Sequence, residues 1–202
     1  MANKKIFGVA YVGNTTVKNL QTHKDKESYK CWYHMIRRCY ENKDTSYKNC
    51  SVCEEWLCYA NFEKWYDDNY WECGSETMHL DKDILKHGNR IYSPNNCIFV
   101  PKDINMLFVK QKNKRINNLP IGVKLDSSTL TRDKQLYVAR ISKKNKTVTI
   151  CRTIDPITAF NSYKVEKENY IKEVADEYKS KYPNFPIKLY EAMYKWEVSI
   201  ND

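Results

Sequence analysis

The sequence predicts an α+β fold built from two modules. Apolar residues at helical spacing indicate two helices in the first half, and a strand–loop–strand–helix order follows them. Beyond residue 119, three strands precede a long helix. We therefore expect a first module over residues 1–109, a basic linker over 110–119 and a second module over 120–202. The hydrophobic fraction of 42% is sufficient for a packed core.

The first module is predicted to start with two amphipathic helices. One covers residues 28–41, and Ser28 could cap its first turn. The other covers about residues 60–69. Large apolar side chains recur on the inner faces of these helices: Trp32, Met35, Ile36, Cys39, Phe62, Trp65 and Tyr66.

A two-stranded unit and a third helix are predicted next. Residues 78–84 alternate like a strand, and the apolar run 97–100 indicates a second strand after a turn-rich loop. Pro101 can occupy the first position of a helix that continues to Phe108. We expect a helical lead-in followed by a ββα unit.

The second module is predicted to be a three-stranded antiparallel sheet packed on a long helix. The strands cover residues 121–125, 136–141 and 147–151, and the helix runs from Asp155-Pro156 to about residue 178. A short helical segment follows around residues 189–194. Alternation in the central strand predicts two faces: Val138 and Arg140 on one, and Tyr137, Ala139 and Ile141 on the other.

Charge favours a polyanionic partner. The chain has 34 Lys and Arg against 25 Asp and Glu, a net charge of +9, so nucleic acid is a candidate partner and an inert basic surface is the alternative. No segment approaches the roughly 20 apolar residues of a membrane span, and the first residues lack the apolar run of a signal peptide. We expect a cytoplasmic protein whose eight cysteines are mostly free thiols.

Polar residues in the predicted ββα unit could carry chemistry. Hydrolysis of a phosphodiester needs a divalent cation, hard oxygen ligands and a base that activates water. A carboxylate on a strand and an amide on the packed helix can hold one ion between two elements. Solvated charge and turn formation are the alternative explanation of the same residues. The set comprises His79, Asp81, Lys82, Asp83, Asn89, Asn95, Asn96 and Asn105.

These residues resemble the phage and homing-type branch of the HNH endonuclease family, over roughly residues 28–110. Asp81 matches the acid of that family's first strand, Asn96 precedes the second strand, and Asn105 follows nine residues later. The resemblance implies a ββα-metal fold in which Asp81 and Asn105 hold Mg²⁺ or Mn²⁺ and Asn96 braces the loop. It also suggests a phage or mobile-element origin.

One position departs from the family pattern. The general-base histidine falls at Lys82, and a lysine with a pKa of about 10.4 cannot accept a proton at neutral pH. His79 and Asp83 would share a strand face with Asp81, so they are the candidate bases, with His87 as a third and Lys82 as a phosphate contact. The departure also supports an alternative: a catalytically inactive HNH-fold DNA-binding protein that regulates or inhibits a host system. A protein-binding adaptor is a third hypothesis.

The second module resembles the APETALA or ethylene-response-factor type of DNA-binding domain. The similarity lies in residues 121–124, 137–141 and 159–163, although Tyr137 stands where that family usually has Trp. The resemblance implies double-stranded DNA as partner, and a solvated basic surface without specificity is the alternative. The predicted DNA contacts are Lys110, Lys112, Lys114 and Arg115 in the linker and Lys124, Arg140, Lys143, Lys144, Lys146 and Arg152 in the sheet.

Two further points concern metal and assembly. Cys50-x-x-Cys53 is half of a zinc-binding pattern, and because no second pair accompanies it we expect no structural zinc. The sequence leaves the oligomeric state open: a monomer would nick one DNA strand, whereas cleavage of both strands would favour a dimer.

Overall fold

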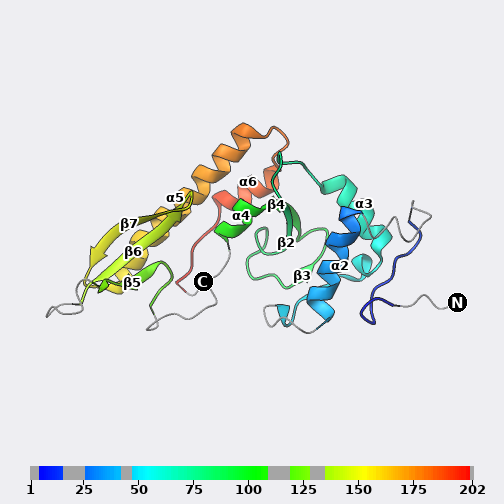
Figure 1. Ribbon diagram of the computed structural model, residues 1–202, viewed down its shortest axis with the longest axis horizontal. Coiled ribbons are helices and arrows are strands. Elements are labelled where there is room, and N and C mark those ends of the chain that lie inside the picture. Colours follow the sequence, from blue (N-terminus) through cyan, green and yellow to red (C-terminus); the bar gives the residue numbers. More distant parts are fainter. Residues whose placement is uncertain (1–4, 16–25, 42–46, 109–118, 128–134, 201–202) are drawn as a thin grey trace. The chain divides into compact units, whose positions relative to one another are not determined.

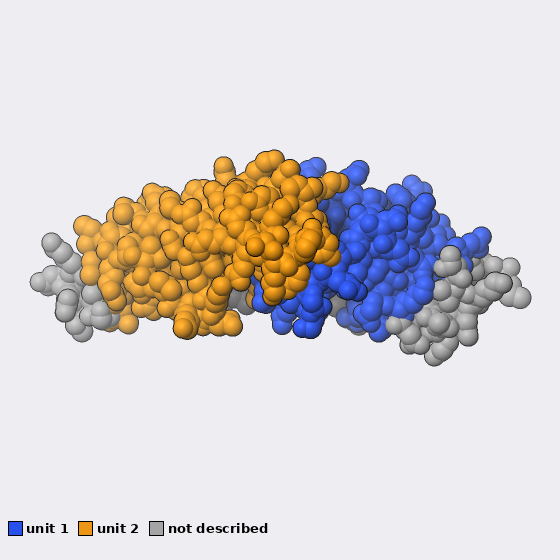
Figure 2. Space-filling view, turned by 90° about the horizontal axis from the view of Figure 1, so that it is seen from above, with its two compact units in different colours: residues 1–105 blue, residues 106–202 orange. Residues whose placement is uncertain are grey.

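The computed structural model describes residues 5–15, 26–41, 47–108, 119–127 and 135–200. It is a mixed α+β protein (Figure 1). The chain forms two compact units, Met1–Asn105 and Met106–Asp202, which Figure 2 colours separately. Residues 110–118 of the predicted linker lie outside the described residues, and with them Lys110, Lys112, Lys114 and Arg115. Among the described helices, none combines the length and apolar character needed to cross a membrane.

Both predicted lead-in helices are present in unit 1. They are α2 (Glu27–Tyr40) and α3 (Tyr59–Asn69), and a short 3-10 helix, η2 (Glu54–Leu57), precedes α3. The predicted Ser28 cap is wrong, because α2 begins one residue earlier, after Lys26. The Ser28 hydroxyl is buried and lies 2.9 Å from the Tyr59 hydroxyl, so it joins α2 to α3.

Aromatic side chains form the core of unit 1. Trp32, Trp56, Tyr59 and Phe62 are all 0% exposed, so the two helices and η2 share one apolar centre. The indole Nε1 of Trp32 donates a hydrogen bond of 2.7 Å to the backbone oxygen of Trp56. The Trp56 Nε1 is itself buried and has no hydrogen-bond partner among the described residues.

This difference gives a stability prediction for two matched substitutions. Trp32→Phe and Trp56→Phe remove the same atoms from fully buried sites, so their cavity costs are similar. Trp32→Phe also deprives a buried carbonyl of its donor, whereas Trp56→Phe removes a donor that is already unpaired. We expect Trp32→Phe to lower the free energy of unfolding by about 1 kcal/mol more than Trp56→Phe. Urea unfolding of both variants measures this, and equal losses would contradict it.

Two small sheets complete unit 1. Strand β2 (Met78–Asp81) pairs antiparallel with β4 (Ile98–Pro101), with Asp81 opposite Ile98, and α4 (Lys102–Leu107) follows β4 directly. The other sheet is a parallel pair that the sequence did not predict, β1 (Ser51–Val52) with β3 (Ile91–Tyr92). Pro101 ends β4 and does not open α4 as predicted.

The first strand is shorter than the predicted range 78–84. It ends at Asp81 because the Asp81 Oδ1 accepts hydrogen bonds from the backbone N–H groups of Asp83 and Ile84, both at 2.7 Å. A side chain that binds the backbone two and three residues later favours a turn over continued strand pairing. The prediction that residues 79, 81 and 83 share one strand face is therefore wrong at 83.

Unit 2 contains the predicted three-stranded antiparallel sheet packed on a long helix. The strands are β5 (Val123–Leu125), β6 (Tyr137–Lys143) and β7 (Lys146–Thr153), in that order. Helix α5 (Pro156–Lys181) runs along the sheet, and α6 (Ile187–Tyr194) packs on α5 (Figure 1). Asp155 caps α5, since its carboxylate accepts the backbone N–H groups of Ile157 and Thr158.

The two faces of β6 differ from the predicted pattern at one residue. Ala139 and Ile141 are buried and Arg140 is exposed, as alternation requires, but Val138 is only 1% exposed. The register shifts between Ala139 and Arg140, which pair with Cys151 and Thr149 and leave one residue of β7 unpaired. A bulge of this kind bends the strand, so Val138 and Arg140 have different surroundings.

Candidate functional site

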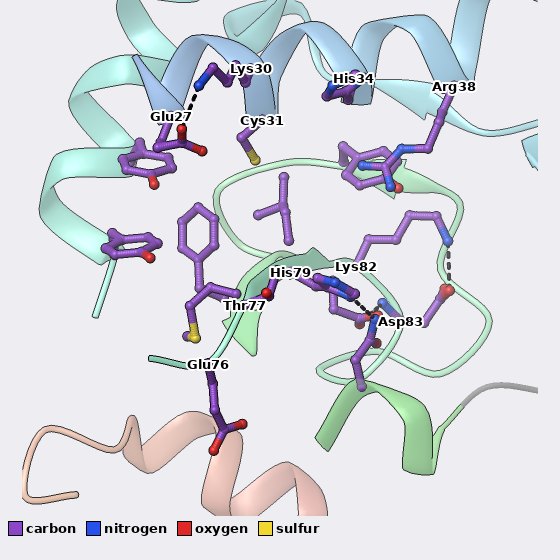
Figure 3. Close-up of a pocket in the computed structure, with 18 of the residues that line it drawn as sticks. Glu27, Lys30, Cys31, His34, Arg38, Glu76, Thr77, His79, Lys82 and Asp83 are labelled. Atoms are coloured by element: carbon purple, nitrogen blue, oxygen red, sulfur yellow. Dashed lines mark hydrogen bonds and ion pairs between the residues drawn. The ribbon is translucent and has the colours of Figure 1, made fainter. Parts of the chain in front are cut away.

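A cavity of about 680 Å³ in unit 1 holds most of the residues that the sequence pointed to. Figure 3 shows it between α2 and the strand that carries His79. Strand β2 and the residues after it form one wall with His79, Asp81, Lys82 and Asp83, and Asn105 of α4 completes that wall. The opposite wall is one face of α2, with Glu27, Lys30, Cys31, His34 and Arg38.

His79 and Asn105 meet although 26 positions separate them in the sequence. The side-chain amide nitrogen of Asn105 lies 3.0 Å from the His79 Nδ1. His79 and Asp81 are two residues apart on β2 and therefore point to the same side of the strand. The carboxylate, the imidazole and the amide thus all reach one cavity from two elements.

The environment of His79 favours its neutral form. Burial lowers the pKa of this imidazole, the positive charges of Lys102 and Arg38 lower it further, and Asp81 acts in the opposite direction. A histidine with a pKa below its ordinary value is unprotonated at neutral pH and can accept a proton. The two other candidate bases, Asp83 and His87, have surroundings that differ from those of His79.

Lys82 and Asp83 form a pair that supports the loop. The Lys82 ammonium lies 2.7 Å from the Asp83 carboxylate, donates to the Asn89 backbone oxygen at 3.2 Å, and sits over the Tyr92 ring. Lys82 is only 6% exposed and has these internal partners, while its predicted phosphate contact stays a prediction. The same ion pair engages the Asp83 carboxylate, which the sequence offered as a candidate base. His87 is exposed in the same loop and does not line the cavity.

Two asparagines organise the loop between β2 and β4. The Asn89 amide donates to the backbone oxygens of Lys82 and Ile91, at 2.9 and 2.7 Å. Its Oδ1 accepts from the Ile91 backbone N–H and from the Asn96 amide, at 3.3 and 3.2 Å. The sequence singled out Asn96 for bracing this loop, but Asn89 makes more of its contacts. The Gly88-Asn89 turn is visible in the sequence, whereas these long-range bonds are not.

The donor groups in the cavity fit a hard divalent cation. The Asp81 Oδ1 is engaged by two backbone N–H groups, and its Oδ2 has no hydrogen-bond donor among the described residues. Burial raises the pKa of this carboxyl, and the two backbone hydrogen bonds oppose that shift. Mg²⁺ is commonly held by one or two carboxylates together with water and substrate phosphate. Asp81 supplies one such carboxylate and Asn105 one amide, and no group of three His, Cys, Asp or Glu side chains in the described part of the chain forms a metal cluster.

The cysteines show no sign of an activated thiol in this cavity. All eight are free, including Cys50 and Cys53. Burial raises the pKa of Cys31, which lines the cavity, to about 12, and that of Cys39 to about 11. These two thiols are therefore protonated at neutral pH and are poor nucleophiles.

The predicted basic surface of unit 2 is divided between two environments. Lys124, Arg140 and Lys146 are exposed, and Arg152 is exposed while paired at 3.0 Å with the buried Asp126. Two other predicted contacts are tied to the helix by carboxylates. Lys143 lies 2.8 Å from Glu166 and 3.4 Å from Glu173, and Lys144 lies 2.9 Å from Glu177, all on α5. Among the described residues, Lys124, Arg140 and Lys146 are therefore the predicted sheet contacts without a carboxylate partner.

No protein-family model matches this chain, and neither does any curated protein or solved structure. Function must therefore be inferred from the chemistry of the residues themselves. The cavity of unit 1 and the exposed cations of unit 2 are the two features that bear on it.

Proposed function

We propose that the chain is an HNH-type endonuclease that binds double-stranded DNA and hydrolyses its phosphodiester bonds with a divalent metal. The observation that carries this proposal is the contact of 3.0 Å between Asn105 and His79 in the cavity that Asp81 also lines. The strand–strand–helix order of β2, β4 and α4 supports it, because that order supplies the carboxylate and the amide from different elements. The net charge of +9 supports a polyanionic substrate.

Each residue then has a definite role. Asp81 and Asn105 would hold Mg²⁺ or Mn²⁺, which neutralises the charge that develops on the phosphate and on the leaving oxygen. His79 would accept the proton of the attacking water at Nε2, which requires its own proton to be on Nδ1. As placed, the Asn105 amide nitrogen faces Nδ1 and donates to it, whereas an amide turned by 180° would present its oxygen there and favour that tautomer. The amide oxygen has two lone pairs, so it can serve both the imidazole and the cation.

The experiment that tests the proposal is nicking of supercoiled plasmid. Wild-type protein should nick with Mg²⁺ or Mn²⁺ and stop in EDTA. His79→Ala should lose at least about 100-fold in rate, the usual size of general-base catalysis, and added imidazole should restore part of it. Rescue separates loss of the base from loss of the fold. Nicking by His79→Ala at the wild-type rate would exclude His79 as the base.

One observation favours a second candidate function, an inactive DNA-binding regulator. The position at which the HNH family carries its base is Lys82, which is buried and paired with Asp83. If wild-type protein binds DNA tightly and in a salt-sensitive manner but never nicks it, this candidate replaces the first. A DNA affinity that does not change between about 50 and 200 mM salt would instead point to a protein-binding adaptor.

The exposed cations of unit 2 give a prediction about DNA affinity. Arg140 is exposed on β6, whereas Lys143 of the same strand is paired with Glu166 and Glu173. Arg140→Ala should weaken binding and reduce the slope of log K against log salt by about 0.9, the value for one lost phosphate contact. Lys143→Ala should leave that slope unchanged. Fluorescence anisotropy with a labelled duplex measures both, and equal slopes for the two variants would contradict the assignment.

A further inference from the structure

Arg38 places a positive charge on the α2 wall of the cavity. Arg38 extends from α2 toward the loop after β2, as Figure 3 shows. Its guanidinium carbon lies 5.3 Å from the centre of the Tyr47 ring and 5.8 Å from that of Tyr92. Rings at these distances attract a cation and hold a planar guanidinium in one orientation.

The guanidinium of Arg38 has a side-chain hydrogen bond with Tyr47, but its hydrogen-bonding is incomplete. Its Nε is buried and has no hydrogen-bond partner among the described residues. A buried donor without a partner costs about 1–3 kcal/mol, and more when the group is charged. A guanidinium presents its donors in a fork that matches the oxygens of carboxylate or phosphate. An anion that enters the cavity would therefore supply what the protein leaves unsatisfied.

The other charged groups of the cavity do not provide that anion. Lys30 is paired with Glu27 at 2.7 Å, and Lys82 is paired with Asp83 at 2.7 Å. Two more acids, Glu76 and Asp81, line the cavity, but no carboxylate of the described residues lies within ion-pair distance of Arg38. The charge of Arg38 nevertheless acts on His79 across the cavity, where it contributes to the lowered pKa of that imidazole.

We propose that Arg38 is the phosphate-binding residue of this cavity and holds the phosphodiester of the substrate strand against His79 and Asp81. The proposal rests on the proposed function for the identity of the ligand. The aromatic contacts of Tyr47 and Tyr92 orient the guanidinium before the strand arrives, which reduces the entropy lost on binding. The site takes one phosphate of a nucleic-acid backbone and reads no base.

The neighbouring residue offers a matched control. Arg37 has the same charge, but it lies 3.7 Å from Glu41 on the exposed side of α2 and does not line the cavity. Arg38→Gln keeps a planar, hydrogen-bonding side chain without charge, and Arg38→Lys keeps the charge without the fork. Comparison of these variants with Arg37→Ala separates a local phosphate contact from the general effect of one positive charge.

Binding of a labelled DNA duplex in EDTA, followed by fluorescence anisotropy between about 50 and 200 mM salt, tests the proposal without cleavage. Arg38→Gln should reduce the salt slope by about 0.9, Arg38→Lys should keep most of the slope, and Arg37→Ala should match wild type. With Mn²⁺ added, Arg38→Gln should also nick plasmid at least about 10-fold more slowly, because the strand is no longer held in place. Thermal unfolding establishes that each variant is folded.

The outcomes separate this inference from the proposed function. If wild type binds DNA and Arg38→Gln keeps the wild-type slope, the inference is overturned and the endonuclease proposal stands. An equal loss of slope for Arg37→Ala and Arg38→Gln overturns it as well, since charge alone would then explain the effect. If wild type binds no DNA, both the proposed function and this ligand are rejected. If Arg38→Gln does not fold, the test rests on the salt slope of Arg38→Lys. A loss of about 0.9 in that slope would count against the proposal, because Arg38→Lys keeps the positive charge.

Discussion

Replacement of Asp81 by asparagine is expected to abolish plasmid nicking and leave DNA binding in place. The variant keeps an oxygen at the position of Oδ1, so the hydrogen bonds from the Asp83 and Ile84 backbone N–H groups can persist. It removes the negative charge that a divalent cation needs. We expect a loss of at least about 100-fold in nicking rate, by comparison with removal of one electrostatic stabiliser from an active site.

Asp81→Ala is the matched variant for this experiment. It removes the charge and also the acceptor that ends β2, so it should both stop nicking and loosen the loop that follows. Hydrogen exchange of the Asp83 and Ile84 amides should therefore be faster in Asp81→Ala than in Asp81→Asn. Wild-type nicking by Asp81→Asn would mean that the carboxylate takes no part in the reaction.

The second large effect is expected for Gly122→Ala in unit 2. Gly122 has φ +75°, a left-handed conformation, and an added Cβ would overlap with Cγ and Cδ2 of the Tyr163 ring on α5. Tyr163 is only 7% exposed, so its ring cannot move aside into solvent without loss of packing. Backbone strain and overpacking together should lower the free energy of unfolding of unit 2 by about 3 kcal/mol.

Gly88→Ala provides the control for the backbone contribution alone. Gly88 has φ +74°, but nothing lies within 4 Å of an added Cβ there. Its substitution should cost only the strain, about 1 kcal/mol. Urea unfolding followed by circular dichroism measures both variants. The Gly122 backbone oxygen accepts a hydrogen bond of 2.9 Å from the Arg140 backbone N–H. A shift of Gly122 should therefore displace Arg140, so Gly122→Ala should also weaken DNA binding. Wild-type stability and wild-type DNA affinity of Gly122→Ala would contradict these expectations.

Elements with long periodic patterns could be predicted from the sequence. The apolar stripe of α2 and α3 and the Asp155-Pro156 start of α5 are local signals, and the structure contains all three helices. Elements that depend on long-range bonds could not. The β1–β3 pair has two residues in each strand, too few to show any alternation, and the end of β2 depends on the hydrogen bonds of Asp81.

The candidate site also combines residues that the sequence indicated with residues that only the tertiary structure brings together. The polar residues of the predicted ββα unit, together with its resemblance to the HNH family, indicated His79, Asp81 and Asn105. The prediction placed Asp83 beside them by assuming an uninterrupted strand, and on the same assumption it pointed Lys82 away from them as a phosphate contact. The α2 wall of the cavity was not predicted at all. Arg38 faces His79 only through tertiary packing, and no spacing within α2 reveals which of Arg37 and Arg38 faces inward.

Anomalous scattering from a crystal soaked in Mn²⁺ would show whether Asp81 and Asn105 hold a metal ion, because it locates the ion without reference to activity. We expect a peak within about 2.2 Å of an Asp81 carboxylate oxygen and of the Asn105 amide oxygen, close to the coordination distance of Mg²⁺. A map with no peak at Asp81, at a Mn²⁺ concentration that supports nicking, would contradict it. So would a peak held by other residues while Asp81 and Asn105 remain apart.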